Sequence, residues 1–224
     1  MTNKLRHPQS ILAIDTVFIR NLADSIGLAG AQVLPIKIEE LAEQAVPHLF
    51  VGCRDTLEKD ERFRQILPYL LFIRPTAEGK IEFFAYQRGK GIGENRLLGK
   101  VSVGVGGHVD LIDLVYSPQS VINLNATVGA SFTREAAEEI IFSEEIGDPK
   151  VVSAGCIVDD SDAVGRVHLG ILLACVIPVG VELTCAEEEL TTIGFRSAED
   201  LLANYELENW SRIALTYAQE TMNG

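Results

Sequence analysis

The chain has 224 residues and a formal net charge of −13, from 19 lysines and arginines against 32 aspartates and glutamates. This acidity disfavours binding to nucleic acid, because affinity for a phosphate backbone depends on clustered lysine and arginine. With 47% hydrophobic residues, no membrane-length apolar run and no secretory pattern at the start, the sequence is typical of a globular protein of the cytoplasm. Reduced thiols are expected, because no CxxC pair or zinc-like spacing occurs among Cys53, Cys156, Cys175 and Cys185.

The N-terminal part is predicted to contain one strand and two helices. Residues 10–19 form an apolar run that favours a strand, and residues 36–47 have the spacing of a short amphipathic helix. The charge-rich segment 55–65 is predicted to be helical as well.

The middle of the chain is predicted to be a series of strands. Residues 69–74 and 81–88 are rich in strand-forming side chains, and residues 75–79 between them favour a hairpin turn. A further strand is expected over residues 98–109, and it contains the pair Gly106-Gly107. Such a pair lets the backbone approach a ligand or a metal without interference from a Cβ atom.

Residues 134–139 read Arg-Glu-Ala-Ala-Glu-Glu. On a helix the spacing of Glu135, Glu138 and Glu139 places three carboxylates on one face, where like charges destabilise each other by a few tenths of a kcal/mol, roughly, per pair. A divalent cation among them would remove this repulsion, and carboxylate oxygens suit Mg²⁺ or Mn²⁺. The alternative interpretation is a solvated acidic helix face.

The C-terminal third is predicted to add strands over residues 151–158 and 167–177, followed by closing helices over residues 197–203 and 207–221. Strands with helices before and after them indicate an α/β fold, with a mixed sheet between helices.

From the glycine pair to residues 134–139, the sequence resembles the Nudix hydrolases. Their signature is G-x5-E-x7-R-E-U-x-E-E-x-G-U, with U a bulky aliphatic residue. The positions that match are Gly107, Asp113 in place of the first glutamate, Arg134, Glu135, Glu138 and Glu139. The resemblance implies a Nudix-like α/β/α sandwich with a mixed sheet. It also implies a single domain over residues 1–224, with an N-terminal extension over 1–66 and a Nudix core over 67–224.

The sequence departs from this signature in three ways. Asp113 is one methylene shorter than the expected glutamate, and twenty residues instead of seven separate it from Arg134. We expect the insertion, residues 114–126, to form a loop that borders the substrate pocket. Ile141 replaces the signature glycine, so the helix is predicted to continue to Gly147. A competing register would use Glu144-Glu145, but it lacks the preceding Arg-Glu.

The resemblance extends over roughly residues 50–175, to a Nudix subgroup described only as predicted phosphoesterases. It implies hydrolysis of a phosphoanhydride bond in a nucleoside diphosphate linked to another group, with Mg²⁺ or Mn²⁺ as cofactor. The implied metal ligands are the Gly107 carbonyl, Glu135, Glu138 and Glu139. The implied catalytic residues are Glu138, which we favour for orienting water, Glu139, and Arg134, which would hold the cluster through Asp113.

Two residues are predicted to bind substrate. Arg88 has the charge to pair with a phosphate, although a surface arginine is the plainer interpretation. His108 either donates to a phosphate or packs, whereas His168 is interpreted as a histidine of the sheet face. Two acidic segments are further candidates for completing the metal shell: Asp159, Asp160 and Asp162, and Glu187, Glu188 and Glu189.

The alternative to an enzyme is a Nudix-fold module that senses a nucleotide ligand without cleaving it. The divergent positions Asp113 and Ile141 favour that hypothesis, whereas the three retained glutamates favour catalysis, because a sensor does not need a repulsive acidic cluster. The expected partner is a small phosphorylated molecule and not a membrane or a nucleic acid. A homodimer is left open.

Overall fold

The computed structural model describes residues 9–30, 32–89, 99–147 and 149–222. Its helices are α1 (Thr16–Ser25), α2 (Ile38–Ala45), α3 (Arg54–Leu57), α4 (Leu124–Glu139), α5 (Ala198–Asn204) and α6 (Asn209–Met222). Its first strands are β1 (Ser10–Asp15), β2 (Val33–Leu34), β3 (Leu49–Cys53), β4 (Phe63–Pro75), β5 (Ile81–Arg88), β6 (Val101–Ser102) and β7 (Gly104–Val105). The later strands are β8 (Ile140–Phe142), β9 (Val151–Ile157), β10 (His168–Val176), β11 (Leu183–Cys185) and β12 (Leu190–Ser197).

The main sheet is mixed. Its central path runs β12-β5-β4-β10-β9-β2, and β1, β3, β6 and β7 pair at its sides. Strands β4 and β10 are parallel over nine residues, from Gln65 opposite His168 to Ile73 opposite Val176, whereas the other pairs are antiparallel. Strands β8 and β11 form a separate two-stranded sheet.

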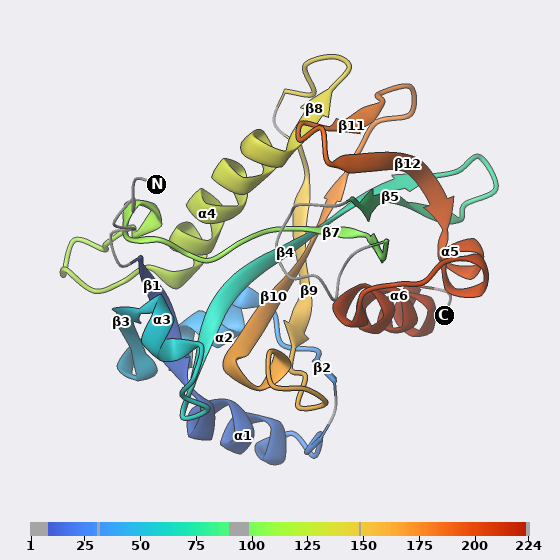
Figure 1. Ribbon diagram of the computed structural model, residues 1–224. Helices are drawn as coiled ribbons and strands as arrows, with labels where there is room; N and C mark the ends of the chain where they lie inside the picture. The colour runs from blue at the N-terminus through green and yellow to red at the C-terminus, as the bar shows by residue number, and fades with distance from the viewer. Residues whose placement is uncertain (1–8, 31, 90–98, 148, 223–224) are drawn as a thin grey trace, which may run out of the picture.

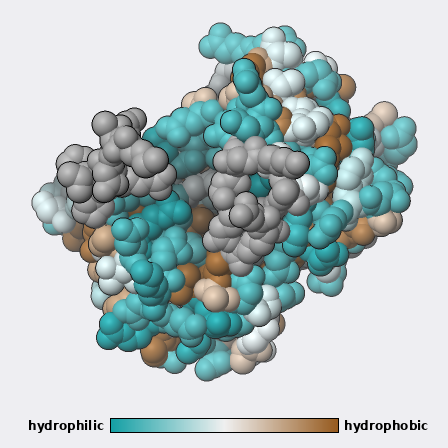
Figure 2. Space-filling model, in the orientation of Figure 1, coloured by the Kyte–Doolittle hydropathy of each residue, from teal (hydrophilic) through white to brown (hydrophobic). Residues whose placement is uncertain are grey.

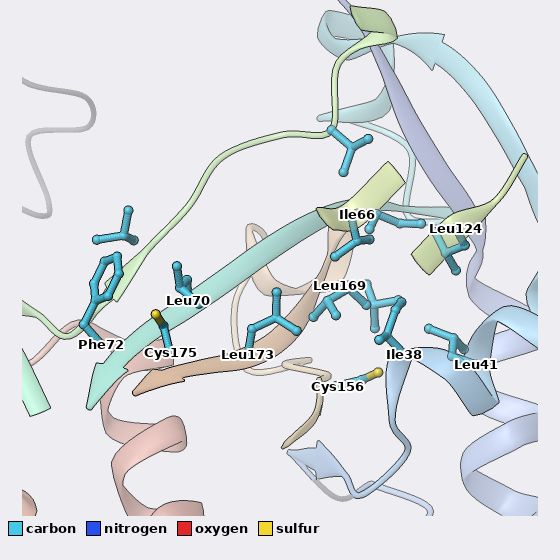
Figure 3. Packing of buried hydrophobic residues seen from close by; sticks show 14 of the residues in the cluster. Ile38, Leu41, Ile66, Leu70, Phe72, Leu124, Cys156, Leu169, Leu173 and Cys175 are labelled. Atoms are coloured by element: carbon cyan, nitrogen blue, oxygen red, sulfur yellow. The ribbon is translucent and has the colours of Figure 1, made fainter. Parts of the chain in front are cut away.

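Helices cover both faces of the main sheet (Figure 1). On β4, Ile66, Leu70 and Phe72 face a core that includes Ile38 of α2 and Leu124 of α4. Figure 3 shows the side chains of β4 and β10 meeting those of α2 and α4 in this core. The alternate residues of β4 face a second core with α5 and α6: Tyr69, Leu71 and Ile73. The α/β/α arrangement predicted from the sequence is therefore confirmed.

Most of the described surface on the face shown in Figure 2 is hydrophilic. Among the described residues, no helix combines the length and apolar character that a bilayer crossing requires.

Several predicted elements have different limits in the structure. The run 10–19 is a strand only to Asp15, whose carboxylate accepts a hydrogen bond from Val17 N and starts helix α1. The helix predicted over 55–65 is wrong beyond α3, because Phe63 begins β4 and pairs with Asp15 of β1. In the strand predicted over 98–109, Leu98 lies outside the described residues, and the rest forms the short strands β6 and β7 before an extended segment.

The strands of the predicted N-terminal extension, β1, β2 and β3, belong to the main sheet. Strand β1 pairs with the first residues of β4 and with β3, and Ile11 and Ala13 pack on Leu57 of α3. This region forms one wall of the cavity described next, through Arg54 and Glu58.

Candidate active site

A cavity of about 800 Å³ lies beside the C-terminal half of α4. Its lining includes the residues predicted as metal ligands, catalytic residues and substrate contacts: Arg88, Gly107, His108, Arg134, Glu135, Glu138 and Glu139. These residues come from β5, from the segment after β7 and from α4. The fold therefore brings together the groups that the sequence places far apart.

Gly106 and Gly107 allow the backbone to pass close to β4 and α4. A Cβ atom on Gly106 would lie 1.9 Å from the Pro68 carbonyl oxygen, and one on Gly107 would lie 2.4 Å from Oε1 of Glu135. Both contacts are shorter than van der Waals distances allow, so no other residue fits here without movement of the backbone or of the glutamate. The absence of a side chain places the Gly107 backbone directly against the Glu135 carboxylate.

Arg134 fastens the segment after the glycines to α4. Its Nε donates to Oδ1 of Asp113 at 2.9 Å, and its Nη2 donates to Oδ2 at 2.7 Å. The same Nη2 donates to the His108 carbonyl at 3.2 Å, and Nη1 donates to Oε1 of Glu135 at 2.7 Å. Asp113 is buried, and its Oδ2 also accepts from Asp110 N. The predicted pairing of Arg134 with Asp113 is therefore present, with the two-pronged geometry that an aspartate in place of glutamate still permits.

The three glutamates differ in their surroundings. Burial raises the pKa of Glu139 to about 7, and the nearby carboxylate of Glu135 adds to the shift. Burial also raises the pKa of Glu135, although Arg134 opposes that shift. The side chain of Glu138 is 60% exposed, and its ion pair with Arg134 is long, at 3.6 Å. The cluster therefore holds more negative charge than its neighbours neutralise.

Arg88 points into the same cavity and is not a free surface arginine. Its Nε donates to Oε1 of Glu208 at 2.5 Å, and its guanidinium carbon lies 5.7 Å from the centre of the Tyr86 ring. The carboxylate of Glu208 neutralises Arg88 in part and holds it at the cavity wall.

His108 and His168 lie side by side on one wall of the cavity, with 3.3 Å between their Nε2 atoms. His168 is buried, and its Nδ1 lies 2.7 Å from the Val164 carbonyl oxygen. Burial, together with the nearby Arg54 guanidinium and His168, lowers the pKa of His108 to about 3, so the ring is neutral near pH 7. The interpretation of His168 as a histidine of the sheet face is correct, but this face is also a wall of the cavity.

The carboxylates of the acidic loop after β9 form hydrogen bonds and an ion pair that stabilise the fold. Asp159 accepts from Asn209 Nδ2 and Ser161 N, and Asp162 accepts from Val164 N and Gly165 N. Asp160 pairs with the buried Arg64 at 2.5 Å. Asp159 and Asp162 border the cavity, whereas Glu187, Glu188 and Glu189 are exposed and do not line it.

Helix α4 ends at Glu139, so the prediction that it continues to Gly147 is wrong. Ile140 leaves the helix with φ −126° and ψ 132° and pairs with Cys185 of β11. The β-branched pair Ile140-Ile141 suits a strand, and Ile140 is buried by this pairing. Glu144 and Glu145 follow β8, outside the cavity, which favours the register that uses Glu138 and Glu139.

The insertion 114–126 differs from the loop that was predicted. Its last residues are the first turn of α4, which Asn123 caps by accepting from Ala126 N. The preceding residues fold back on the helix, where Thr127 Oγ1 accepts from Val115 N at 3.0 Å. No residue of 114–126 lines the cavity, so the expected position at the pocket is not observed.

The cavity wall also includes residues that the sequence patterns do not assign to the site, among them Glu58, His168 and Glu208. Each lies on an element whose local pattern indicates only structure. Glu58 is in a charge-rich segment and His168 is in an apolar strand. The parallel pairing of β10 with β4 positions His168 at the cavity, and the end of α3 positions Glu58 there.

No family model matches the sequence. Protein YmaB of Bacillus subtilis (strain 168) is 34% identical to the chain over 165 residues, which are 72% of this chain and 74% of that protein. The crystal structure of Tm1382, a candidate Nudix hydrolase, has a TM-score of 0.68 at 20% identity and covers 95% of this chain and 99% of its own. The second likeness shows that the fold is that of the Nudix superfamily.

Proposed function

The chain belongs to the family of protein YmaB and has a Nudix fold. We propose that it is a metal-dependent hydrolase of phosphoanhydride bonds. The proposed substrate is a nucleoside diphosphate linked to another group. The observation that carries the proposal is the position of Glu135, Glu138 and Glu139 on one wall of an open cavity, against a backbone that lacks side chains at Gly106 and Gly107.

The donor set fits a hard divalent cation. Its side-chain donors are all carboxylate oxygens, and the Gly107 carbonyl would add a fourth oxygen. Glu139 is buried with a pKa raised to about 7, so the folded chain resists its ionisation unless positive charge is near. Mg²⁺ or Mn²⁺ held there would lower the pKa of a bound water and offset charge on the transferring phosphoryl group.

Each residue of the site has a proposed task. Glu138 is the most exposed of the three glutamates and the least engaged by Arg134, so it is assigned to orient the attacking water and accept its proton. Arg134 keeps Glu135 and the His108 backbone in place and does not touch the substrate. Water adds to phosphorus, the bridging P–O bond breaks, and two phosphorylated products leave.

Two groups on the opposite walls are assigned to the substrate. Arg88 would pair with a phosphate oxygen in place of part of its contact with Glu208, because both partners offer anionic oxygens to the same guanidinium. His108 is neutral and lines the cavity, and its Nδ1, the ring nitrogen that does not face His168, would be the hydrogen-bond donor for a phosphate.

The test is a panel of nucleotide sugars, dinucleoside polyphosphates and nucleoside triphosphates, incubated with the full chain and Mg²⁺ or Mn²⁺. We expect release of a nucleoside monophosphate from at least one compound, and loss of that release when the metal is chelated. Tight binding of a nucleotide without turnover in the whole panel would instead support the sensing module.

A further inference from the structure

We propose that the cavity contains a second metal site, separate from the carboxylate cluster of α4, in which His108, His168 and Glu58 bind a transition-metal dication of the Zn²⁺ type. The proposal stands on its own geometry and does not require the proposed hydrolysis. It concerns the wall formed by α3, the start of β10 and the segment after Gly107.

The distances among the three side chains suit one ion. One ligand atom from each residue lies within 4.8 Å of the other two, and the Nε2 atoms of His108 and His168 are 3.3 Å apart. Two nitrogens bound to the same tetrahedral zinc, each at about 2.0–2.1 Å, are separated by about 3.3 Å. The side chain of Glu58 is 33% exposed, so a change of rotamer can adjust the position of its carboxylate.

His168 is held in the orientation that a metal ligand needs. Its Nδ1 lies 2.7 Å from the Val164 carbonyl oxygen, so we assign the proton to Nδ1, and the lone pair of Nε2 then faces His108. Metal-binding histidines commonly donate their second N–H to a carbonyl in this way. The ring also packs edge-on against Trp210, with 6.4 Å between centroids, which limits its rotation.

His108 is fixed through its backbone and is neutral. Its carbonyl accepts from Arg134 Nη2 at 3.2 Å, so the clamp on α4 also sets the position of this ring. Two imidazoles with one carboxylate form a nitrogen-rich ligand set that selects zinc and related ions over Mg²⁺. The two metal sites of the cavity would therefore differ in ion preference because they differ in donor atoms.

The buried amide of Gln65 lies next to His168 in the sheet, although Gln65 itself does not line the cavity. Gln65 of β4 is the Cα partner of His168 in the parallel pair, so both side chains project from the same face of the sheet. Gln65 is fully buried, and within the described chain neither its Nε2 nor its Oε1 has a hydrogen-bond partner. Buried amides are normally satisfied, so this sheet position behind His168 is an unusual place for an unpaired polar side chain.

Arg54 is the charge that opposes a cation here. Its Nε lies 3.3 Å from Oε1 of Glu58, and its Nη1 donates to Gln9 Oε1 at 2.9 Å. Asp110, also on this wall, accepts from Gln9 Nε2. Because Arg54 competes with the ion for Glu58, its removal should strengthen metal binding, whereas removal of Glu58 should weaken it.

The experiment is a Zn²⁺ titration of the full chain in excess Mg²⁺, with bound metal measured after equilibrium dialysis. The parent should bind one Zn²⁺ per chain. His108→Gln, His168→Gln and Glu58→Gln should each weaken binding by about a hundredfold or more, since even outer-shell changes cost about ten- to a hundredfold. Arg54→Gln should tighten it. Co²⁺ in place of Zn²⁺ should give the visible absorption of a tetrahedral site in the parent.

Two control variants separate this site from its alternatives. His48→Gln removes a histidine that stacks on Phe18 outside the cavity, and Glu139→Gln changes only the carboxylate cluster. Both should retain the Zn²⁺ site. Glu58→Gln alters a partly exposed side chain, so cooperative thermal unfolding with lost Zn²⁺ binding separates a ligand defect from a folding defect. No Zn²⁺ binding in excess Mg²⁺, or binding that only Glu139→Gln abolishes, would overturn the proposal.

Discussion

The two halves of helix α4 have different surroundings: the N-terminal half packs in the core, and the C-terminal half faces the cavity. In the N-terminal half, Leu124, Val128 and Ser131 are almost fully buried against the sheet. In the C-terminal half, Glu135, Glu138 and Glu139 face the cavity, and the helix stops where the strand pairing of β8 begins. Residues that stabilise the fold and residues proposed to act on a substrate therefore lie in separate halves of one helix. Substitutions in the two halves should therefore have opposite signatures.

Glu139→Gln should have the largest effect on activity. The change keeps the size of the side chain but removes one negative oxygen, so hydrolysis should fall by about a hundredfold or more, since one positioned electrostatic group contributes about 3 kcal/mol. Initial rates on the substrate found by the panel measure this loss. The matched control is Glu144→Gln, outside the cavity, which should keep nearly the rate of the parent. Loss of activity in the control alone would show that the register is wrong.

Leu124→Ala should have the reverse signature. Leu124 is 1% exposed in the core between α4 and the sheet, and truncation of such a leucine costs about 2–5 kcal/mol of unfolding free energy. Chemical denaturation measures this change. Activity per folded molecule should stay within a few-fold of the parent at a temperature where the variant is folded. A loss of activity as large as that of Glu139→Gln would contradict the separation of stabilising and functional residues along α4.

Asp113→Asn tests the link between the two sides of the cavity. The buried aspartate binds Arg134 through two hydrogen bonds, so the change should lower the unfolding free energy by about 1–3 kcal/mol and also reduce activity. Asp60→Asn is the control, because Asp60 forms a similar two-pronged contact with Arg62, whose side chain is 79% exposed. That surface pair should contribute little to stability, because solvent screens it. Equal losses in the two variants would argue against a special role for the clamp.

The pH dependence of stability should reveal the crowding of the carboxylates. The pKa of Glu139 is raised from 4.5 to about 7, so between these pH values the folded chain binds more protons at this position than the unfolded chain. Its contribution to stability therefore falls as pH rises through that window. In metal-free buffer, the unfolding free energy of Glu139→Gln relative to that of the parent should increase between pH 5 and pH 7.5. The increase should be on the order of 1 kcal/mol after allowance for solvent screening. Parallel curves from denaturant titrations would contradict this.

Local patterns predicted strands well where neighbouring residues decide the structure. The limits of β5 are those predicted, because its strand-forming residues and the turn at Gly79 act locally. The end of α4 was missed because Ile140 leaves the helix to pair with Cys185, forty-five residues away. Helix α1 was missed although a local signal exists, since Asp15-Thr16 is a helix-capping pair inside an apolar run.

The candidate site was predicted in part for the same reason. The spacing of Glu135, Glu138 and Glu139 needs only a helix, and the partner of Arg134 came from a family resemblance. His108 and His168 are sixty residues apart, and their contact depends on the parallel register of β4 with β10. A sequence pattern contains no local sign of such a pairing.

The proposed function depends above all on the binding of a divalent cation by the glutamates of α4. The most direct test is thermal unfolding with increasing Mg²⁺, an ion that prefers oxygen ligands and so avoids the histidine pair. In the parent the melting temperature should rise with Mg²⁺, because binding to the folded state adds RT ln(1 + [L]/Kd), about 2.7 kcal/mol at a hundred times Kd. In Glu139→Gln the rise should be lost or need much more Mg²⁺. An unmoved parent, or equal shifts in parent and variant, would contradict the account.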